Sequence, residues 1–419
     1  MSQNKTKKLG KVNGNTLIAA IDIGKKMNYG YFRAPDGRDV KPFAFYNLRD
    51  GFEKFWAKLV EFHKAYNLEG IVVGFESTGP YAEPMLHFLK KRKVTLVQTN
   101  PMHTKRLKEL TGNSPNKTDE KDPRVIADVI SLGHALTLVI PEGPAAELRR
   151  LSQARERAIK ARTAMGNQLQ HLLFVIFPEF LWTMKHMKSK SVLHLVESCP
   201  TPESITRIGI DALCAILRKV SRGKLGQERA REIFEAAQKS IGISEGKESI
   251  LKEIGHLVLN IRNEDRYIES LEAQMEHYLA EIPYSHSILS IKGIGKVTAA
   301  GLIGEVGDFR KFSTIREITK LAGLDLYEIS SGRKKGQRRI SKRGRPYLRK
   351  LLFFAAINVV KSEGILHAQY QQMLGRGMAK IKALIAISRK LLRIIFAIVR
   401  DNALYTSNHQ HVSHSKLAA

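Results

Sequence analysis

Apolar positions in residues 15–140 alternate between short continuous runs and runs with helical spacing. The continuous runs at 16–23, 27–33, 70–75 and 94–99 predict strands, and the alternating pattern of 38–46 predicts a further strand. Residues 51–66 predict an amphipathic helix, and another helix is expected from about Tyr81. Three strands followed by alternating helices and strands indicate an α/β domain with a mixed sheet.

The pattern changes in residues 141–285, where strand signals nearly vanish and apolar residues recur at heptad-like spacing. This region is predicted to be helical. Residues 250–279 fit a coiled coil or a long hairpin arm, and an ordinary helical bundle fits them equally well, because periodicity alone cannot separate these packings. A third domain is expected at 286–406, between the helical region and a polar tail at 407–419. A length of 419 residues agrees with several domains.

The net charge of the chain indicates what kind of molecule it binds. The chain has 69 Lys and Arg against 40 Asp and Glu, a net charge of +29. Such an excess favours a polyanionic partner, and the common intracellular polyanions are nucleic acids. A basic membrane-surface protein is less favoured, because the basic residues are spread through the sequence instead of gathering on one amphipathic helix.

Other composition features exclude several classes of protein. Cys199 and Cys214 are the only cysteines, too few for a disulfide framework or a cysteine zinc site. The basic tail at 1–14 has no apolar core of a signal peptide, and the apolar stretch 383–399 is interrupted by Arg389, Lys390 and Arg393. We therefore expect a cytoplasmic, nucleoid-associated protein with no membrane partner.

Four acidic residues are candidates for one metal site. Asp22 and Glu76 each end a predicted buried strand, where a carboxylate is costly unless it meets hydrogen bonds or a cation. Asp119 and Asp122 are spaced to share one face at the start of a helix, although acids there are also ordinary capping residues. Together the four carboxylates could hold two divalent cations about 4 Å apart, a geometry suited to phosphoester chemistry. Mg²⁺ is expected, because all the ligands are oxygens.

A very basic segment follows in the third domain. Ten Lys or Arg and no acid lie between Ser331 and Lys350, a density suited to contacts with phosphates. A flexible basic loop with only non-specific contacts is the alternative. The expected nucleic-acid-binding residues are Gly332, Arg333, Lys334, Lys335, Arg338, Arg339, Lys342 and Arg343.

Ser331 is a candidate nucleophile at the head of this segment, because surrounding positive charge could lower its pKa and hold a phosphate close. Ser330 and Ser341 compete with it for this role.

A glycine-rich turn upstream resembles a helix-hairpin-helix. Lys292, Gly293, Gly295 and Lys296 precede a predicted helix whose first N–H groups could accept a DNA phosphate. A tight turn between helices that binds nothing would have the same pattern.

Several segments together resemble the insertion-sequence-110/116/902 family of transposases, also called DEDD recombinases. They occur in the family's order at both ends of the chain. The matching segments are IDIGKK, GFESTGPY, NPMHTKRLKELTGNSPNKTDEKDPRVIADVI, SIKGIGKVTAAGLIGEVGDFRKF and LAGLDLYEISSGRKKGQRRISKRGRPYLRKLL.

The resemblance implies a RuvC-like, ribonuclease-H-fold domain at 15–140 and a C-terminal transposase domain. The apolar spacing predicts the helical, coiled-coil region that lies between them. It implies that Asp22, Glu76, Asp119 and Asp122 form an acidic tetrad and that Ser331 is the catalytic serine. It also implies a phosphoserine intermediate on donor and target DNA, a structured guide RNA, and a homo-oligomer, either a dimer or a tetramer. Two other functions stay open: a RuvC-like junction nuclease that uses metal-activated water, and a nucleic-acid-binding protein without catalysis.

Overall fold

The computed structural model describes residues 12–76, 79–92, 94–111, 121–328, 336 and 338–406. The chain divides into two compact units, Met1–Ile140 and Pro141–Ala419. No described helix is both long enough and apolar enough to cross a membrane. Most of the basic tail at 1–14 and the whole polar tail at 407–419 lie outside the described residues.

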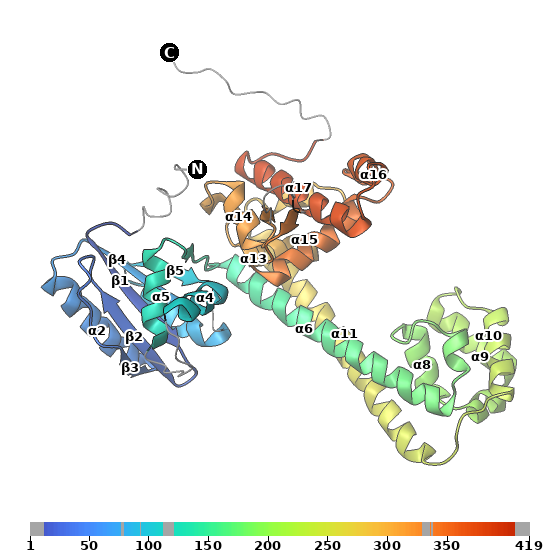
Figure 1. The fold of residues 1–419 in the computed structure, drawn as a ribbon. Helices are drawn as coiled ribbons and strands as arrows, with labels where there is room; N and C mark the ends of the chain where they lie inside the picture. Colours follow the sequence, from blue (N-terminus) through green and yellow to red (C-terminus); the bar gives the residue numbers. More distant parts are fainter. Residues whose placement is uncertain are drawn as a thin grey trace. The chain divides into compact units, whose positions relative to one another are not determined.

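The first unit contains a six-stranded mixed sheet in the order β3-β2-β1-β4-β5-β6 (Figure 1). β1 pairs with β2 in antiparallel and with β4 in parallel orientation. The strands are β1 (Thr16–Ile23), β2 (Met27–Arg33), β3 (Phe43–Tyr46), β4 (Gly70–Glu76), β5 (Thr95–Thr99) and β6 (Leu136–Thr137). The helices are α2 (Arg49–Ala65), α3 (Glu83–Lys90), α4 (Pro101–Thr111) and α5 (Lys121–Ser131), with a 3₁₀ turn η1 (Gly79–Ala82) before α3.

β1 is apolar along nearly its whole length because both faces of the sheet are covered. Leu17, Ala19 and Ile21 point into a core shared with α2 and α3. Ile18 and Ala20 point into the opposite core, which is shared with α5. The expected mixed sheet with helices packed on it is therefore present.

The strand expected at 38–46 is shorter than predicted, because only Phe43–Tyr46 forms β3. Proline has no N–H to donate to a strand ladder, and Pro42 stands directly before β3. Upstream of it, only an isolated bridge between Arg33 and Asp39 continues the pairing with β2.

The second unit is mostly helical. Its first part contains α6 (Pro144–Ile176), α7 (Phe180–Thr183), α8 (Lys190–Ser198), α9 (Pro202–Ser221), α10 (Gln227–Gln238) and α11 (Lys247–Ala280). Its last part contains α12 (Ser285–Leu289), α13 (Lys296–Val306), η2 (Phe309–Lys311), α14 (Ile315–Leu321), β7 (Leu326–Glu328), β8 (Arg338–Ile340), α15 (Pro346–Val359), α16 (His367–Gly375) and α17 (Lys380–Arg400).

α6 and α11 form a long antiparallel helix pair (Figure 1). Arg155 of α6 pairs with Glu272, whereas Arg162, two turns later in α6, pairs with Asp265, which is earlier in α11. The partner in α11 therefore moves backward as α6 advances, which defines the antiparallel orientation.

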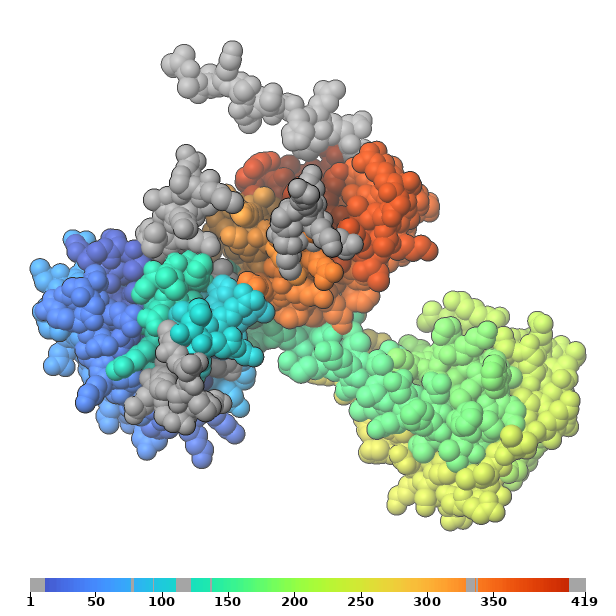
Figure 2. Space-filling view, in the orientation of Figure 1, coloured from blue at the N-terminus to red at the C-terminus, as the bar shows by residue number. Residues whose placement is uncertain are grey.

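A separate helical core surrounds one end of this pair. We call residues 177–246, which contain α7 to α10, the head; it is the green and yellow mass in Figure 2. Leu169 and Leu173 of α6 and Ile254 and Leu257 of α11 pack into the head core.

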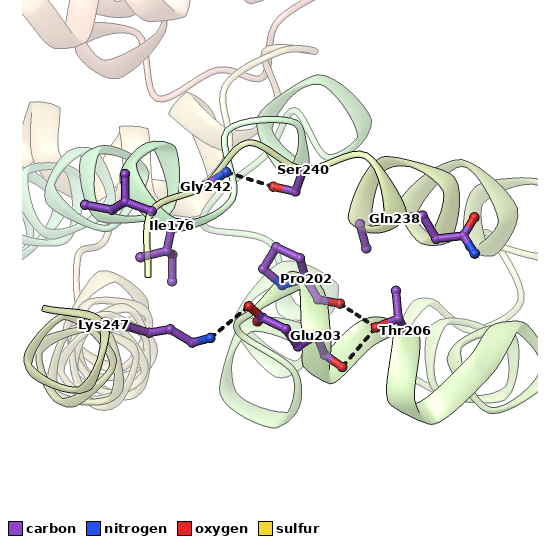
Figure 3. Close-up of a pocket in the computed structure, with 10 residues that line it drawn as sticks. Ile176, Pro202, Glu203, Thr206, Gln238, Ser240, Gly242 and Lys247 are labelled. Carbon is purple, nitrogen blue, oxygen red and sulfur yellow. Dashed lines mark hydrogen bonds and ion pairs between the residues drawn. The ribbon is translucent and has the colours of Figure 1, made fainter. Parts of the chain in front are cut away.

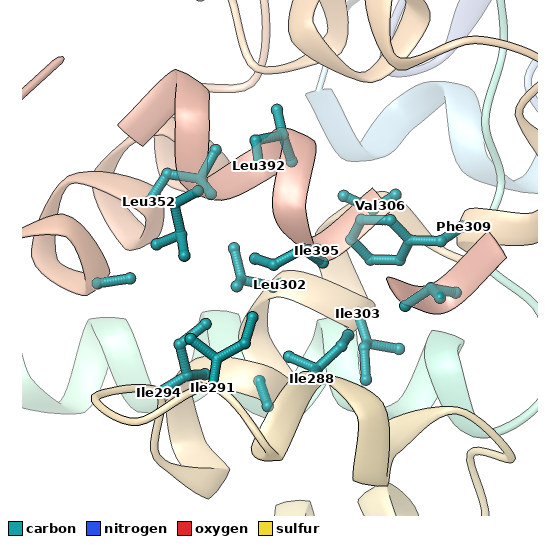
Figure 4. Close-up of a cluster of buried hydrophobic side chains, with 14 of the residues drawn as sticks. Ile288, Ile291, Ile294, Leu302, Ile303, Val306, Phe309, Leu352, Leu392 and Ile395 are labelled. Carbon is teal, nitrogen blue, oxygen red and sulfur yellow. The ribbon is translucent and has the colours of Figure 1, made fainter. Parts of the chain in front are cut away.

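The C-terminal core surrounds the other end of the pair (Figure 4). Leu148 of α6 and Leu279 of α11 pack there with α13, α15 and α17. α13 approaches α6 closely because Gly304 has no side chain; a Cβ there would lie 2.6 Å from the backbone nitrogen of Arg149. The antiparallel pair thus joins two hydrophobic cores.

Candidate active site

Two of the candidate acids lie on neighbouring strands. Asp22 is the penultimate residue of β1 and Glu76 is the last residue of β4. The parallel register sets Ile21 opposite Phe75, so the two acids follow at adjacent positions at the carboxyl ends of their strands. Both side chains are half-buried.

Both acids face the side of the sheet that α5 covers. Side chains alternate along a strand, and Ile18, Ala20 and Val72, which share a face with the acids, belong to the core under α5. Gly74 lets this helix come close, since a Cβ there would lie 2.2 Å from Cδ1 of Ile130.

α5 directs its first turn, which carries Asp122, toward the strand ends. Asp128 pairs with Arg33 at 2.5 Å, and Arg33 stands opposite Ile18 near the start of β1. Arg124, one turn earlier in α5, stacks on Tyr31, which stands opposite Ala20. Residues nearer the start of α5 therefore lie further along β1, toward Asp22.

The Arg33–Asp128 contact fastens α5 to the sheet. Burial disfavours the charge of Arg33, but hydrogen bonds to Asp128 and Tyr31 outweigh that effect and raise the pKa of the guanidinium. Arg33 therefore stays charged, and the ion pair holds α5 on the sheet in the direction that carries Asp122 to the strand ends.

Two consecutive turns of α4 connect Glu76 with Asp122. The hydroxyl of Thr104 donates a hydrogen bond to Oε2 of Glu76 at 2.7 Å, and Nζ of Lys108 lies 2.6 Å from Oδ1 of Asp122. Thr104 and Lys108 are four residues apart and so share one helical face. Glu76 and Asp122 therefore contact the same face of α4, one turn apart. Sequence reasoning missed both α4 residues; their spacing within the segment NPMHTKRLKELTG was the available signal.

The metal site expected from the sequence is only partly visible. Within the described ranges, no group of three or more His, Cys, Asp or Glu side chains is arranged to hold a metal ion. The fourth predicted ligand, Asp119, lies outside these ranges. In this structure Asp122 pairs with the ammonium group of Lys108.

The predicted serine belongs to the second unit. β7 and β8 form an antiparallel hairpin, with Glu328 paired to Arg338 at 2.9 Å. The connection between these strands contains Ser330, Ser331, Gly332, Arg333, Lys334 and Lys335, all of which lie outside the described residues. Arg338 and Arg339 are exposed on β8.

The base of this hairpin is closely packed. A Cβ on Gly344 would lie 2.4 Å from the backbone nitrogen of Gly323, so the two chain segments touch backbone to backbone. Lys342, next to Arg343, adopts a positive φ of 54° in this turn. Arg349 of α15 donates a hydrogen bond to the carbonyl oxygen of Ala322 at 3.0 Å. The two strands of the hairpin therefore extend from a closely packed base.

The segment that follows the hairpin contacts a residue with a buried carboxylate. Glu305 of α13 is only 2% exposed, and its Oε1 accepts a hydrogen bond from Gln153 of α6 at 3.0 Å. Arg345, which precedes α15, donates to the backbone oxygen of Glu305. Burial and the nearby charge of Arg149 lower the pKa of Arg345 to about 10, against the opposing effect of Glu305. This network ties α6, α13 and α15 together.

The glycine-rich turn lies between α12 and α13. Gly293 has a φ of +105°, which a larger residue would adopt only with strain. A Cβ at this position would also lie 3.1 Å from Cγ1 of Val359. Gly295 directly precedes α13. Lys292 pairs with Glu363 at 2.7 Å, and Lys296 pairs with Glu276. Each lysine therefore meets a carboxylate of the chain itself.

Comparison with known proteins places this chain in a family. A transposase family matches residues 19–178, and the transposase IS116/IS110/IS902 family matches residues 285–371. The chain belongs to the IS116/IS110/IS902 transposase family. Asp22, Glu76 and Asp122 fall in the first matched segment of this transposase, and the β7–β8 hairpin falls in the second.

Relatives of the transposase match it over shares of its length that range from about a third to nearly the whole. An uncharacterized 43.6 kDa protein of insertion element IS110 from Streptomyces coelicolor is 24% identical over 93% of this chain and 96% of its own length. The transposase for insertion sequence element IS1111A from Coxiella burnetii is 24% identical over 69% of this chain and 68% of its own. A pilin gene-inverting protein from Moraxella lacunata is 32% identical over 34% of this chain and 46% of its own length.

Proposed function

We propose that this transposase cuts and rejoins donor and target DNA with a serine nucleophile and a divalent cation held by acidic residues. The observation that carries the proposal is the bridge from Glu76 through Thr104 and Lys108 to Asp122, beside Asp22 on the neighbouring strand. Enzymatic cleavage and rejoining of DNA agrees with the family and with the transposase and gene-inverting relatives.

The proposed cation is Mg²⁺, since carboxylate oxygens are its usual protein ligands. Asp22, Glu76, Asp119 and Asp122 would hold it, with Asp119 contributed from outside the described residues. The ammonium ion of Lys108 at Asp122 supports this assignment, because the acids already accept a positive charge there. When bound, the ion would stabilise negative charge that develops on the phosphate oxygens.

The proposed nucleophile is Ser331, with Ser330 as its immediate competitor. The serine Oγ loses its proton and attacks the phosphorus, the bond from phosphorus to a deoxyribose oxygen breaks, and that oxygen leaves as a hydroxyl. A hydroxyl of a second DNA end then attacks the phosphoserine, which forms a new phosphodiester and returns the free serine. Strand exchange through a Holliday-junction-like state would follow.

DNA contacts are proposed for two basic surfaces. The hairpin would contribute Arg338 and Arg339, together with the basic residues of its connection. The turn between α12 and α13 would act as a helix-hairpin-helix, in which Gly293 and Gly295 allow close approach to a phosphate. Lys292 and Lys296 would exchange their glutamate partners for that phosphate.

Further features are proposed from the family resemblance. The mixed sheet supports a RuvC-like fold for the first unit, since three antiparallel strands precede parallel strands that alternate with helices. A structured guide RNA and a homo-oligomer, dimer or tetramer, complete the proposal. In that assembly the acids and the serine would form one composite site.

The test is a cleavage reaction with DNA that carries the element ends, in Mg²⁺ and with co-purified RNA, analysed by denaturing electrophoresis. The unchanged protein should become covalently attached to a cleaved DNA end. Ser331→Ala should lose the adduct and lower joining by about a thousandfold or more, as expected for loss of a nucleophile. Asp22→Asn should also abolish cleavage, whereas Ser341→Ala, the matched control, should retain it.

Two outcomes would contradict the serine mechanism. If Ser331→Ala and Ser330→Ala both still cleave DNA while Asp22→Asn does not, the enzyme uses metal-activated water, as a junction nuclease does. If neither acid nor serine variants change the products, the proposed site is in the wrong place. Thermal unfolding of each variant checks that a loss of activity does not reflect a loss of fold.

A further inference from the structure

A basic cavity lies where the end of the first family match, which covers residues 19–178, meets the segment that follows it. It has a volume of about 370 Å³ and opens where α6 meets the segment 184–189 that leads into α8. Its polar lining comes from both elements and consists of Arg162, Asn167, Gln170, Lys185, His186, Lys188 and Ser189.

Specific packing forms this cavity. A Cβ on Gly166 would lie 2.8 Å from both Cγ and Cδ of Lys188, so the lysine stem crosses α6 at the one position in that turn without a side chain. Met184 and Met187 are buried on either side and anchor the segment in the head core. Arg162 donates a hydrogen bond to the carbonyl oxygen of Lys188 at 3.3 Å. The lysine is therefore held by contacts on both sides.

The cavity carries excess positive charge. No Asp or Glu lines it, and no ion pair in the described part of the chain involves Lys185 or Lys188. Nζ of Lys188 donates only to the neutral hydroxyl of Thr163, at 3.3 Å. The lining residue Arg162 is different, because its charge is neutralised by Asp265 of α11 at 2.5 Å.

A second cavity is lined by a lysine and by a carboxylate that neutralises it (Figure 3). Its volume is about 500 Å³, and its one lysine, Lys247, lies 2.9 Å from Glu203. The hydrogen bond from Lys247 lowers the pKa of Glu203 to about 2, so this ion pair persists at neutral pH. That cavity is neutralised by its own residues, whereas the basic cavity lacks a counter-charge.

We propose that the basic cavity binds a phosphate of a nucleic-acid backbone. Lys185 and Lys188 would supply the charge, and the amides of Asn167 and Gln170 would supply further hydrogen-bond donors. Phosphate contacts of this kind position a protein on a nucleic acid without reading its sequence. The inference rests on the proposed function in one respect, namely that the substrate of the enzyme is a nucleic acid.

The first test measures how binding of the full-length protein depends on salt. The variant Lys185→Gln/Lys188→Gln keeps the Cβ and Cγ methylenes of both side chains and removes two charges. Lys219→Gln/Lys224→Gln, which removes two charges from exposed positions elsewhere in the head, is the matched control. Fluorescence anisotropy with duplex DNA and with single-stranded RNA shows which nucleic acid occupies the cavity.

The cavity variant should bind about tenfold more weakly at moderate salt. Its slope of log affinity against log salt should fall by roughly one for each phosphate that the protein no longer neutralises. The control should keep the original slope, and Lys185→Arg/Lys188→Arg should restore it. Equal slopes for the cavity variant and the unchanged protein, with both nucleic acids, would overturn the proposal.

A second test measures whether nucleic acid lies at the basic cavity. Cys199 and Cys214 are both buried, so Gln170→Cys gives a single accessible thiol for a photo-crosslinker. Nucleic acid should crosslink at position 170, and Lys185→Gln/Lys188→Gln should suppress the adduct. The same label at Lys219→Cys should give little adduct, and equal yields from both positions would contradict the inference.

The crosslink also separates this inference from the proposed function. Asp22→Asn should lose cleavage and keep the adduct at position 170. A protein that forms the adduct but never cuts DNA would refute the serine–metal mechanism alone. A protein that cuts DNA but forms no adduct would refute the cavity alone.

Discussion

Gly74 shows how one residue controls the approach of α5 to the sheet, since a Cβ there would lie 2.2 Å from Cδ1 of Ile130. Gly74→Ala should therefore overpack this contact and destabilise the first unit by about 1–3 kcal/mol. The displaced helix carries Asp122, so DNA cleavage should fall as well. Urea unfolding and the cleavage reaction measure the two effects.

Gly255 supplies the matched control at the residue scale. It is an exposed residue inside α11, and a Cβ there would meet nothing within 4 Å. Alanine is the better helix former, so Gly255→Ala should stabilise the protein by up to about 1 kcal/mol. Destabilisation by both substitutions would show that contact with Ile130 is not what makes Gly74 necessary.

At the scale of elements, the antiparallel orientation of α6 and α11 is marked by ion pairs. Arg155 and Glu272 are joined at 2.6 Å, with side chains 23% and 36% exposed. Reversing one charge with Arg155→Glu should destabilise the helix pair, and adding Glu272→Arg should recover most of the loss. A double-mutant cycle in urea should give a coupling of about 0.5–1 kcal/mol for a partly exposed pair.

The Arg229–Glu232 pair in α10 is the control for this cycle. It links residues within one helix and does not join α6 to α11. The control reverses only Glu232, because Arg229 also donates a hydrogen bond to the carbonyl oxygen of Thr183 at 2.8 Å. Glu232→Arg should change stability only slightly, because a local pair on an exposed helix face contributes little. Failure of Glu272→Arg to rescue Arg155→Glu would mean that this contact does not stabilise the helix pair.

At the scale of the whole molecule, the proposed metal site would gather carboxylates in a chain with a net charge of +29. Carboxylates brought together repel one another, so a bound cation should stabilise the folded protein. Mg²⁺ at a hundred times its dissociation constant should add about 2.7 kcal/mol to the free energy of unfolding. Thermal unfolding with and without Mg²⁺ measures this shift.

Asp22→Asn separates this effect from general salt stabilisation. Removing one carboxylate should reduce the shift on addition of Mg²⁺. Asp211→Asn, at an exposed position in the head, should leave the shift unchanged. An equal shift in all three proteins would show that the acids do not hold the ion.

Strongly buried helices and strands could be predicted from the sequence alone. β1 and β4 are continuous apolar runs because both faces of the sheet are covered, and α11 keeps a helical apolar period over its whole length. The sequence also located Asp22 and Glu76 at strand ends, because a carboxylate directly after an apolar run stands out. The strand at 38–46 was predicted too long, since the alternating pattern continues through Pro42 although proline cannot support the ladder.

Contacts between side chains that are far apart in the chain could not be predicted without the folded structure. The spacing of Thr104 and Lys108 places them on one helical face, but only the packing of α4 brings them to Glu76 and Asp122. Lys188 and Gly166 likewise become neighbours only when the head folds against α6. Periodicity reports which face of an element is buried, whereas the contact partner depends on packing between elements that are far apart in the chain.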